Sequence, residues 1–468
     1  MAGFFSVGEK KVRPGAYFNV QTNDALTNGA VDGVVAVLFR ATMGPLGVVR
    51  ELEAADGYAK IYGTGGTTDA MREAIYGGAL RIVACRVGTG GTAASVQLTA
   101  ATGKLQITAK NVGAATYKVT VRTKLVDTTK KEIVFYVDDT EIEKYSFTAG
   151  DDEVAAAIAA VPANSLFALE AVSSGAGVIT NVTQTALTGG VDPTVNNAAY
   201  SAAIEEIEKY FFNVIVVDTE DATVHALVAA FLNRIYDAGQ FGMAVLAPLS
   251  TATVSARAAA AAAFNAENII YPVNPSAYDG ETLLSGYQVA AYIGGLVAST
   301  PANMSVTHVA MDRYTAVGEI LTNSEIEEVE ESGCVVLTSN NAGTVWLDNA
   351  VNTLITPDGN HDAGWKKIRR VKARYELLYR ANNAADELVG QVDNDVNGRA
   401  TIMSQIQAAC NDMVDEGKLQ YADVTESTTV RADGDTCGFD IDVIDLDSAE
   451  HIYLTYYFRF STIVPEAE

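Results

Sequence analysis

The sequence predicts a mixed α/β and α+β protein of several domains, with a parallel α/β sheet at its centre. Its 468 residues are enough for roughly three domains at ~150 residues each. Strand and helix patterns alternate between residues 193 and 344, as in a parallel sheet that helices cover. Short strands rich in Thr and Val dominate residues 91–192, and a helix pair followed by strands fills most of 345–468. These patterns predict an α/β domain, an inserted β-rich domain and a C-terminal α+β domain.

The central sheet is predicted from short, continuous apolar runs. Such runs are typical of strands that are buried on both faces, as parallel strands are. Two of them lie before the β-rich region, at residues 33–42 and 81–87, with a short helical pattern at 68–76 between them. The later runs are 213–218, 242–246 and 268–272, and helical patterns surround them at 196–210, 222–236, 255–264 and 281–298.

The β-rich region is bracketed by two glycine pairs, Gly90-Gly91 and Gly189-Gly190. Between them, alternating strands are clearest at 104–109, 116–122 and 132–137, and one short helix is expected at 152–160. About 100 residues of different character between two glycine pairs indicate a module inserted into a surrounding domain.

The last third begins with strands at 334–338 and 344–347. A helix pair is predicted next, at 365–396 and 399–416, with a break at Asn397-Gly398. Alternating strands at 438–443 and 452–460 close the chain.

Both ends of the chain carry apolar segments that are too short to be domains. Unpaired strands with one apolar face tend to add to a sheet edge of another chain, so we expect these segments to be inter-subunit arms. Their apolar residues are Phe4, Phe5, Val7, Val12, Tyr17, Phe18 and Val20 at the N-terminal end, and Ile452, Leu454, Tyr456, Phe458 and Phe460 at the C-terminal end.

The formal net charge of −26 argues against nucleic acid and anionic membranes as partners, because most of the surface would repel phosphate. No run approaches the ~18 apolar residues that a membrane helix needs. No secretory leader is evident, so we expect a protein made and kept in a cytoplasm. The four cysteines are scattered without a C-x-x-C pair, which favours packed, reduced thiols over a metal site or disulfides.

No residue pattern supports catalysis or a cofactor. The turns after the predicted parallel strands lack phosphate-binding glycines, and no nucleophile elbow occurs. Residues 393–398, D-N-D-V-N-G, match the first half of a calcium loop, but Ser404 stands where the bidentate Glu is needed. We therefore favour a plain helix stop and start at this loop, while calcium binding stays open. No catalytic, cofactor-binding or metal residues are predicted.

Positive charge is concentrated in one window. Residues 361–380 hold seven Lys and Arg against two acids, a net +5, while the remaining chain has 25 against 56, or −31. On a helix, Lys366, Arg370 and Arg374 share one face. This face is either solvated and balanced by neighbouring acids, or it is a docking surface for an acidic partner.

Four stretches together resemble the sheath proteins of contractile phage tails, especially those of prophages in Gram-positive bacteria. They are R-P-G-A-Y-F-N at 13–19; G-V-V-A-V-L-F at 33–39 with G-P at 44–45 and V-V-R-E-L at 48–52; the basic helix leading to A-A-D-E-L-V-G-Q-V-D-N-D-V-N-G-R at 384–399; and V-I-D-L-D-S-A-E-H-I-Y-L-T-Y-Y-F-R at 443–459. The chain has Met43 where the family usually has Trp, and residues 91–192 match only as the family's variable inserted domain.

The resemblance implies a structural protein without cofactors. Subunits would stack as six-membered rings around a tail tube and contract to drive it through a cell envelope, using energy stored in the lattice and no nucleotide. The implied parts are an N-terminal arm (1–20), the first part of the sheath core (21–90), the inserted domain (91–192), the α/β domain (193–344), a C-terminal domain for polymerisation and tube binding (345–450) and a C-terminal arm (451–468).

The implied partners are further copies of the chain, the tube protein, and the baseplate and tail terminator proteins. The implied location is a virion tail assembled in the host cytoplasm. Lys366, Lys367, Arg370 and Arg374 are expected to face the tube. Two other readings stay open: a non-contractile surface-layer or capsid-like protein, and an enzyme built on the central α/β domain.

Overall fold

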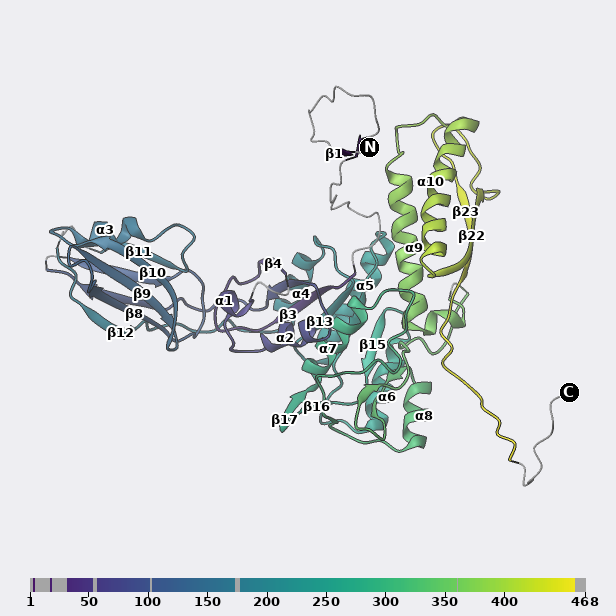
Figure 1. Cartoon of the computed structure of the whole chain (residues 1–468), viewed down its shortest axis with the longest axis horizontal. Coiled ribbons are helices and arrows are strands. Elements are labelled where there is room, and N and C mark those ends of the chain that lie inside the picture. The colour runs from purple at the N-terminus through teal and green to yellow at the C-terminus, as the bar shows by residue number, and fades with distance from the viewer. Residues whose placement is uncertain are drawn as a thin grey trace.

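The computed structural model describes residues 32–53, 57–101, 103–172, 177–359 and 361–458, together with the backbone of two short N-terminal strands. The architecture is a mixed α/β multidomain fold, with a central, mostly parallel sheet and several antiparallel sheets (Figure 1). This confirms the predicted fold class.

The central sheet has seven strands in the order β19-β15-β14-β13-β3-β5-β4. Neighbouring strands are parallel except β4, which runs antiparallel to β5 at one edge. Every residue of β3 and β13 is buried, as their unbroken apolar sequences predict. The strands are β3 (Val34–Phe39), β4 (Val49–Glu53), β5 (Arg81–Arg86), β13 (Val214–Val217), β14 (Met243–Val245), β15 (Ile269–Pro272) and β19 (Cys334–Val335).

Helices cover both faces of this sheet because successive side chains of a buried strand point to opposite sides. Helices α2 (Asp69–Tyr76) and α7 (Gly286–Ser299) pack with Val35, Val37 and Phe39 on one face. The other face of the sheet packs against α4 (Asn197–Ile207), α5 (Ala222–Asp237) and α6 (Val254–Phe264), with α8 (Asn323–Glu331) at the margin. Helices α2 and α7 touch so closely that a Cβ on Gly295 would lie 2.0 Å from the carbonyl oxygen of Ala74.

The helix predicted at 281–298 begins later than expected. Residues 276–285 form a hairpin of β16 (Ser276–Asp279) and β17 (Thr282–Ser285), to which β18 (Ala316–Val317) adds. Ser285 ends the hairpin and also caps α7 together with Gln288. The helical pattern was extended too far because Thr282–Ser285 has apolar residues that suit either structure.

The β-rich region folds around a hydrophobic core of its own and projects from the central sheet (Figure 1). Its two antiparallel sheets have the orders β10-β9-β8-β12 and β11-β7-β6, and Phe135 stacks on Phe167 between them at 4.1 Å. Its elements are β6 (Ser95–Thr99), β7 (Lys104–Ala109), β8 (Tyr117–Thr123), β9 (Lys130–Val137), β10 (Thr140–Thr148), α3 (Glu153–Ala160), β11 (Phe167–Ala171) and β12 (Val182–Ala186).

The buried Arg86 fastens this region to the central sheet. Its guanidinium donates to the carbonyl oxygens of Ala41 and Gly44 on the sheet side and to that of Val112 on the other. The short helix α1 (Ala59–Tyr62) lies on the face of the sheet that α2 and α7 cover, and the Tyr62 ring packs edge-on against Phe39.

The C-terminal part consists of a helix pair and a hairpin. Its elements are β20 (Leu337–Ser339), β21 (Val345–Leu347), the 3₁₀ turn η1 (Ala363–Lys366), α9 (Ile368–Asp386), α10 (Val396–Asp415), β22 (Leu419–Glu426) and β23 (Phe439–Asp445). The predicted break at Asn397-Gly398 was placed too late. Helix α9 already ends at Asp386, and α10 begins at Val396 because the Asp395 carboxylate accepts from the Gly398 N–H at 2.7 Å.

The prediction of a strand at 452–460 is wrong for the isolated subunit. None of residues 452–458 belongs to a strand, and the segment runs away from the body (Figure 1). A strand needs a neighbour for its backbone hydrogen bonds, and this segment has none within the described chain. Near the N-terminus, β1 (Gly3–Phe4) pairs in parallel with β2 (Tyr17–Phe18). The other predicted arm residues, Phe5, Val7, Val12, Val20 and Phe460, lie outside the described residues.

Candidate functional site

The crevice where parallel α/β proteins usually bind ligands is filled by side chains here. That crevice lies at the carboxyl ends of β3 and β13, where the strand order reverses. Asp218 follows β13 and its side chain is fully buried. It accepts hydrogen bonds from Arg40 Nε at 2.8 Å, from the Tyr200 hydroxyl at 2.5 Å and from the Thr67 hydroxyl. These contacts tie the two halves of the sheet together.

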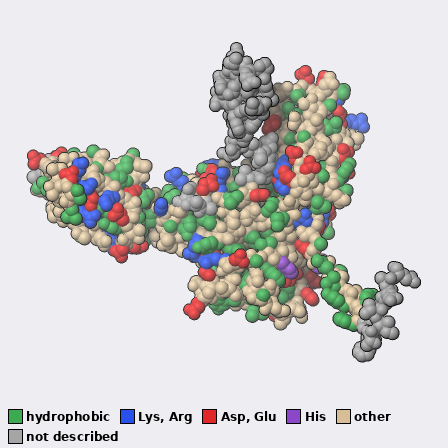
Figure 2. Space-filling model, in the orientation of Figure 1, with side chains coloured by type: hydrophobic (Ala, Val, Ile, Leu, Met, Phe, Trp, Pro, Cys, Tyr) green, Lys and Arg blue, Asp and Glu red, His purple; other side chains and the backbone are tan. Residues whose placement is uncertain are grey.

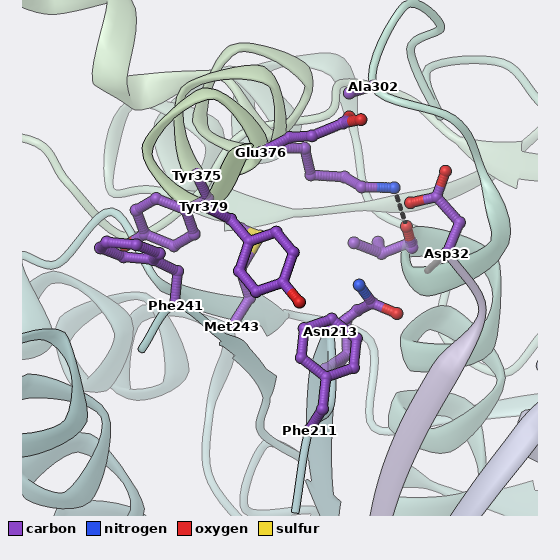
Figure 3. Close-up of a pocket in the computed structure, with 12 residues that line it drawn as sticks. Asp32, Phe211, Asn213, Phe241, Met243, Ala302, Tyr375, Glu376 and Tyr379 are labelled. Atoms are coloured by element: carbon purple, nitrogen blue, oxygen red, sulfur yellow. Dashed lines mark hydrogen bonds between the residues drawn. The ribbon is translucent and has the colours of Figure 1, made fainter. Parts of the chain in front are cut away.

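A small cavity at the opposite, amino ends of the strands separates the sheet from α9 (Figure 3). Its volume of about 50 Å³ suits one or two waters rather than a substrate. Lys372 reaches into it from α9 and donates to the carbonyl oxygens of Val297, at 2.6 Å, and Thr300 at the end of α7. Burial lowers the pKa of Lys372 to about 8, although Asp32 and Glu376 oppose this shift. The cavity is therefore a small gap in the contact between α9 and the sheet and not a substrate site.

The loop at 393–398 is a helix start. Asp395 caps α10, and Asn394 Nδ2 donates to the carbonyl oxygens of Gly434 and Thr436 at 2.9 Å each. These contacts agree with the reading that the sequence favours. Among the described residues, no group of three His, Cys, Asp or Glu side chains could hold a metal ion. Cys85, Cys334 and Cys410 are buried free thiols, and Cys437 is half-buried.

The basic window 361–380 is the most heavily paired surface of the C-terminal part. Lys367 binds Glu450 and donates to Asn349 Oδ1 at 2.9 Å. Arg370 forms two hydrogen bonds to Asp445, at 2.9 and 2.6 Å. Lys366 has no carboxylate partner within the described ranges.

Arg374 continues the same face of α9. It donates to Asp445 at 2.9 Å and to Asp362 at 3.0 Å, and its guanidinium lies over the Trp365 ring at 4.6 Å. Arg369 adds a hydrogen bond to Ser448 Oγ at 3.1 Å. The partners of this basic face are thus mainly residues 445–450 of the same chain, a segment that we call the arm root.

The carboxylates of the arm root are held in the charged form. Burial disfavours ionisation of Asp445, but hydrogen bonds and charge from Arg370 and Arg374 outweigh it and keep its pKa below the ordinary value. The same balance, with Lys367 as the dominant cation, lowers the pKa of Glu450. Both carboxyl groups therefore stay ionised at neutral pH.

Beyond the arm root the chain is exposed and apolar. Ile452 is 74% exposed and Phe458 95%, and hydrophobic side chains follow one another along the segment (Figure 2). The nearby hairpin of β22 and β23 packs one side on α10, while Ile444 on β23 is 50% exposed. In the described structure this sheet has only two strands. An exposed apolar segment and an incomplete sheet thus occur in the same part of the chain.

The sequence did not reveal the partners of the basic face. In the sequence, the alternation of Asp with apolar residues at 439–445 fits the solvated side of a strand as well as a set of partners for α9. One signal was available: seven cations and a dense run of acids lie some 75 residues apart, with opposite charges that could neutralise each other.

Comparison with known proteins identifies the central part of the chain. Residues 194–353 match the family described as the phage tail sheath protein central domain. The chain carries the central domain of the tail sheath family. This assigns residues 194–353 to a domain of tail sheath proteins, a family that is structural and not enzymatic. The resemblance seen in the sequence is confirmed.

Several relatives extend the sheath likeness beyond that domain. The uncharacterized protein YqbK of Bacillus subtilis is 22% identical over 356 residues, or 72% of this chain and 73% of that protein. The sheath tail protein of Desulfitobacterium hafniense has a TM-score of 0.70 at 22% identity, over 92% of this chain and 100% of that chain. The sheath tail protein of Listeria innocua also scores 0.70, at 21% identity, over 90% and 94%.

A more distant structure is the helical sheath of the anti-feeding prophage in its contracted state. It has a TM-score of 0.56 at 12% identity, over 96% of this chain and 99% of that chain. The likenesses show that the fold as a whole is sheath-like. Separately, none of the helices in the described part of the chain is long and apolar enough to cross a membrane.

Proposed function

We propose that this chain is the subunit of a contractile tail sheath, which polymerises as stacked six-subunit rings around a tail tube and contracts to drive the tube through a cell envelope. The observation that carries the proposal is the combination of a sheath central domain with an exposed apolar segment at 452–458 and a two-stranded sheet at β22 and β23. Each subunit would offer both an arm and a place for a neighbour's arm.

Strand addition supplies the physical basis of this connection. An extended segment with an apolar face binds to a sheet edge through backbone hydrogen bonds, and its alternate side chains fill the apolar surface. Eighteen extended residues span ~60 Å, which is enough to reach a neighbouring subunit. Because the donor and the acceptor surfaces differ, the contact is heterologous and can continue without closing, as a helical polymer requires.

No nucleotide is needed in this proposal, since the work of contraction comes from the difference in free energy between two lattices. The filled crevice around Asp218 supports this, because its carboxylate already has three side-chain partners within the chain. The proposed partners are further copies of this chain, a tube protein, and baseplate and terminator proteins, within a virion tail assembled in a bacterial host.

The tube-facing role of Lys366, Lys367, Arg370 and Arg374 stays a prediction. Three of the four are engaged with carboxylates of their own chain, which leaves Lys366 as the cation most available to a partner. If this face of α9 binds a tube, reversing the charge of Lys366 should abolish binding to the tube and leave sheath polymers intact, because the other three cations already hold carboxylates of their own chain.

Removal of residues 451–468 tests the proposed function. We expect the full chain to form tubes in negative-stain electron microscopy and the truncated chain to remain a soluble monomer in sedimentation analysis. Circular dichroism should match between the two, because residues 452–458 contribute no helix or strand to the isolated subunit. Normal tubes from the truncated chain would refute the arm exchange, and flat arrays or closed shells from the full chain would favour a surface-layer or capsid-like protein.

A further inference from the structure

We propose that the basic beginning of α9 is a seat for the C-terminal arm: it holds the arm root, residues 445–450, and thereby sets where the arm leaves the subunit. The inference rests on the proposed function, since an exchanged arm is what requires a fixed origin. It gives Lys367, Arg370 and Arg374 a positioning role.

The inner end of the arm root is held by two arginines. Asp445 receives a two-point contact from Arg370, from Nε at 2.9 Å and from Nη2 at 2.6 Å, and a third hydrogen bond from Arg374 at 2.9 Å. A bidentate contact between two planar groups fixes orientation as well as distance. These contacts therefore hold the end of β23 against α9 in a single orientation.

The outer end of the arm root is Glu450, on whose carboxylate two parts of the fold converge. Lys367 donates from the start of α9, while Ser305 Oγ, at 3.1 Å, and Thr307 Oγ1, at 3.0 Å, donate from the loop after α7. The Glu450 side chain is only 10% exposed. Because its donors come from separate elements, Glu450 cannot shift along α9 without losing some of them.

Anchoring ends sharply at this point. None of the described residues from 451 to 458 belongs to a helix or strand, and Tyr453 and Phe458 are almost fully exposed. The chain thus changes from fixed to unanchored within one or two residues of Glu450. A fixed base followed by an exposed apolar segment is the arrangement expected of an arm that is presented to a neighbour.

A fixed origin benefits assembly in three ways. It confines the volume that the arm searches, which raises its effective concentration at a neighbour's sheet edge, and it lowers the ordering cost of binding. It also gives every subunit the same offset to its neighbour, which a regular helix requires. The charges matter because each group of the seat is partly buried, so removal of one partner leaves the other uncompensated.

A charge swap between Lys367 and Glu450 in the full chain tests the proposal. The single variants Lys367→Glu and Glu450→Lys place like charges together, and the double variant restores an opposite pair. We expect each single variant to form at least fivefold less polymer in sedimentation, and the double variant to recover to within twofold of the original chain. Lys144→Glu, which breaks an exposed pair with Glu141 on the inserted domain, is the control and should polymerise normally.

A distance measurement on the monomer makes the test independent of polymerisation. Spin labels on Tyr456→Cys and Glu327→Cys, in a Cys437→Ser background, report the distance distribution between the arm and α8. We expect the single variants to broaden this distribution at least twofold and the double variant to narrow it again.

Two results would overturn the seat. One is an unchanged distance distribution in the single variants, and the other is normal polymers that fail only to bind a tube. If the original chain forms no polymer, the proposed function fails, while the distance measurement still decides whether α9 positions the arm.

Discussion

Glu330, near the end of α8, has a carboxyl group in the wall of a cavity of about 500 Å³. Its Oε1 atom is shielded from solvent and has no hydrogen-bond partner in the described structure. Burial, followed by the nearby charge of Asp348, raises the pKa of Glu330 to about 7, although Asn349 and Lys367 partly oppose the shift. The folded protein therefore retains a proton that the unfolded chain releases at lower pH.

This difference makes stability depend on pH. Between pH ~4.5 and about 7 the unfolded chain loses the proton while the folded chain keeps it, so the free energy of unfolding falls as pH rises through this window and levels off above it. We expect Glu330→Gln to remove this loss. At pH 8 the variant should be more stable by about 1 kcal/mol, after allowance for partial exposure, and at pH 4.5 it should match the original chain.

The measurement is chemical unfolding of both chains at several pH values. Glu327→Gln, an exposed position on the same helix, is the control and should show no such trend. A stability difference that is equal at pH 4.5 and pH 8 would show that the cavity does not hold Glu330 in its neutral form.

At the scale of single elements, the sequence predicted the buried parallel strands β3, β5, β13, β14 and β15, because a strand buried on both faces must be apolar throughout. Residues 214–217 and 34–39 contain apolar residues only, and every one of them is buried. The sequence missed the edge strand β4, in which three of five residues are exposed. Helix ends were less predictable. The start of α10 at Val396 depends on Asp395 as its cap, and several Asp and Asn residues nearby could have served in its place.

The candidate site was predictable only in part. A basic helix face and apolar arms can be read from spacing, but the pairing of Arg370 with Asp445 spans 75 residues and depends on the tertiary fold. The strand at 452–460 failed for a related reason: its alternation is real, but a strand forms only beside a partner, and the partner is absent from a single chain.

The two faces of the C-terminal arm make a prediction at the element scale. If the arm adds to a sheet as a strand, Leu454 and Phe458 lie on one face, and Tyr453 and Tyr457 lie on the other. We expect Leu454→Asp with Phe458→Asp to abolish polymerisation, because two charges would be buried against apolar surface.

The matched control places the same two charges on the opposite face, as Tyr453→Asp with Tyr457→Asp, and should reduce polymer yield severalfold less. Sedimentation and negative-stain microscopy of both variants make the measurement. Equal loss in the two variants would argue against a strand that buries one face and leaves the other exposed.

At the scale of the whole molecule, the inserted domain is built as a separable unit. The chain enters and leaves it side by side, since Thr89 N–H donates to the Thr194 carbonyl at 2.9 Å and Thr92 N–H donates to that of Val191 at 3.1 Å. Its core consists almost entirely of its own residues, and Met43 is the one residue from the sheet side among the described members of the buried cluster. The arms, the seat on α9 and the central sheet all lie outside it.

We therefore expect the domain at 91–192 to be dispensable for folding and for polymerisation. Replacing it by a short Gly-Ser linker should leave the central sheet intact, at a cost of about 1–3 kcal/mol, because Arg86 loses the Val112 carbonyl and Met43 loses its apolar neighbours. The excised domain should fold alone, with a cooperative thermal transition, since both of its sheets and its core are retained.

Negative-stain microscopy of the shortened chain should show tubes of smaller outer diameter, because the domain projects from the body (Figure 1). A shortened chain that folds but remains monomeric would instead assign a lattice contact to the inserted domain, and polymerisation would then depend on more than the arms.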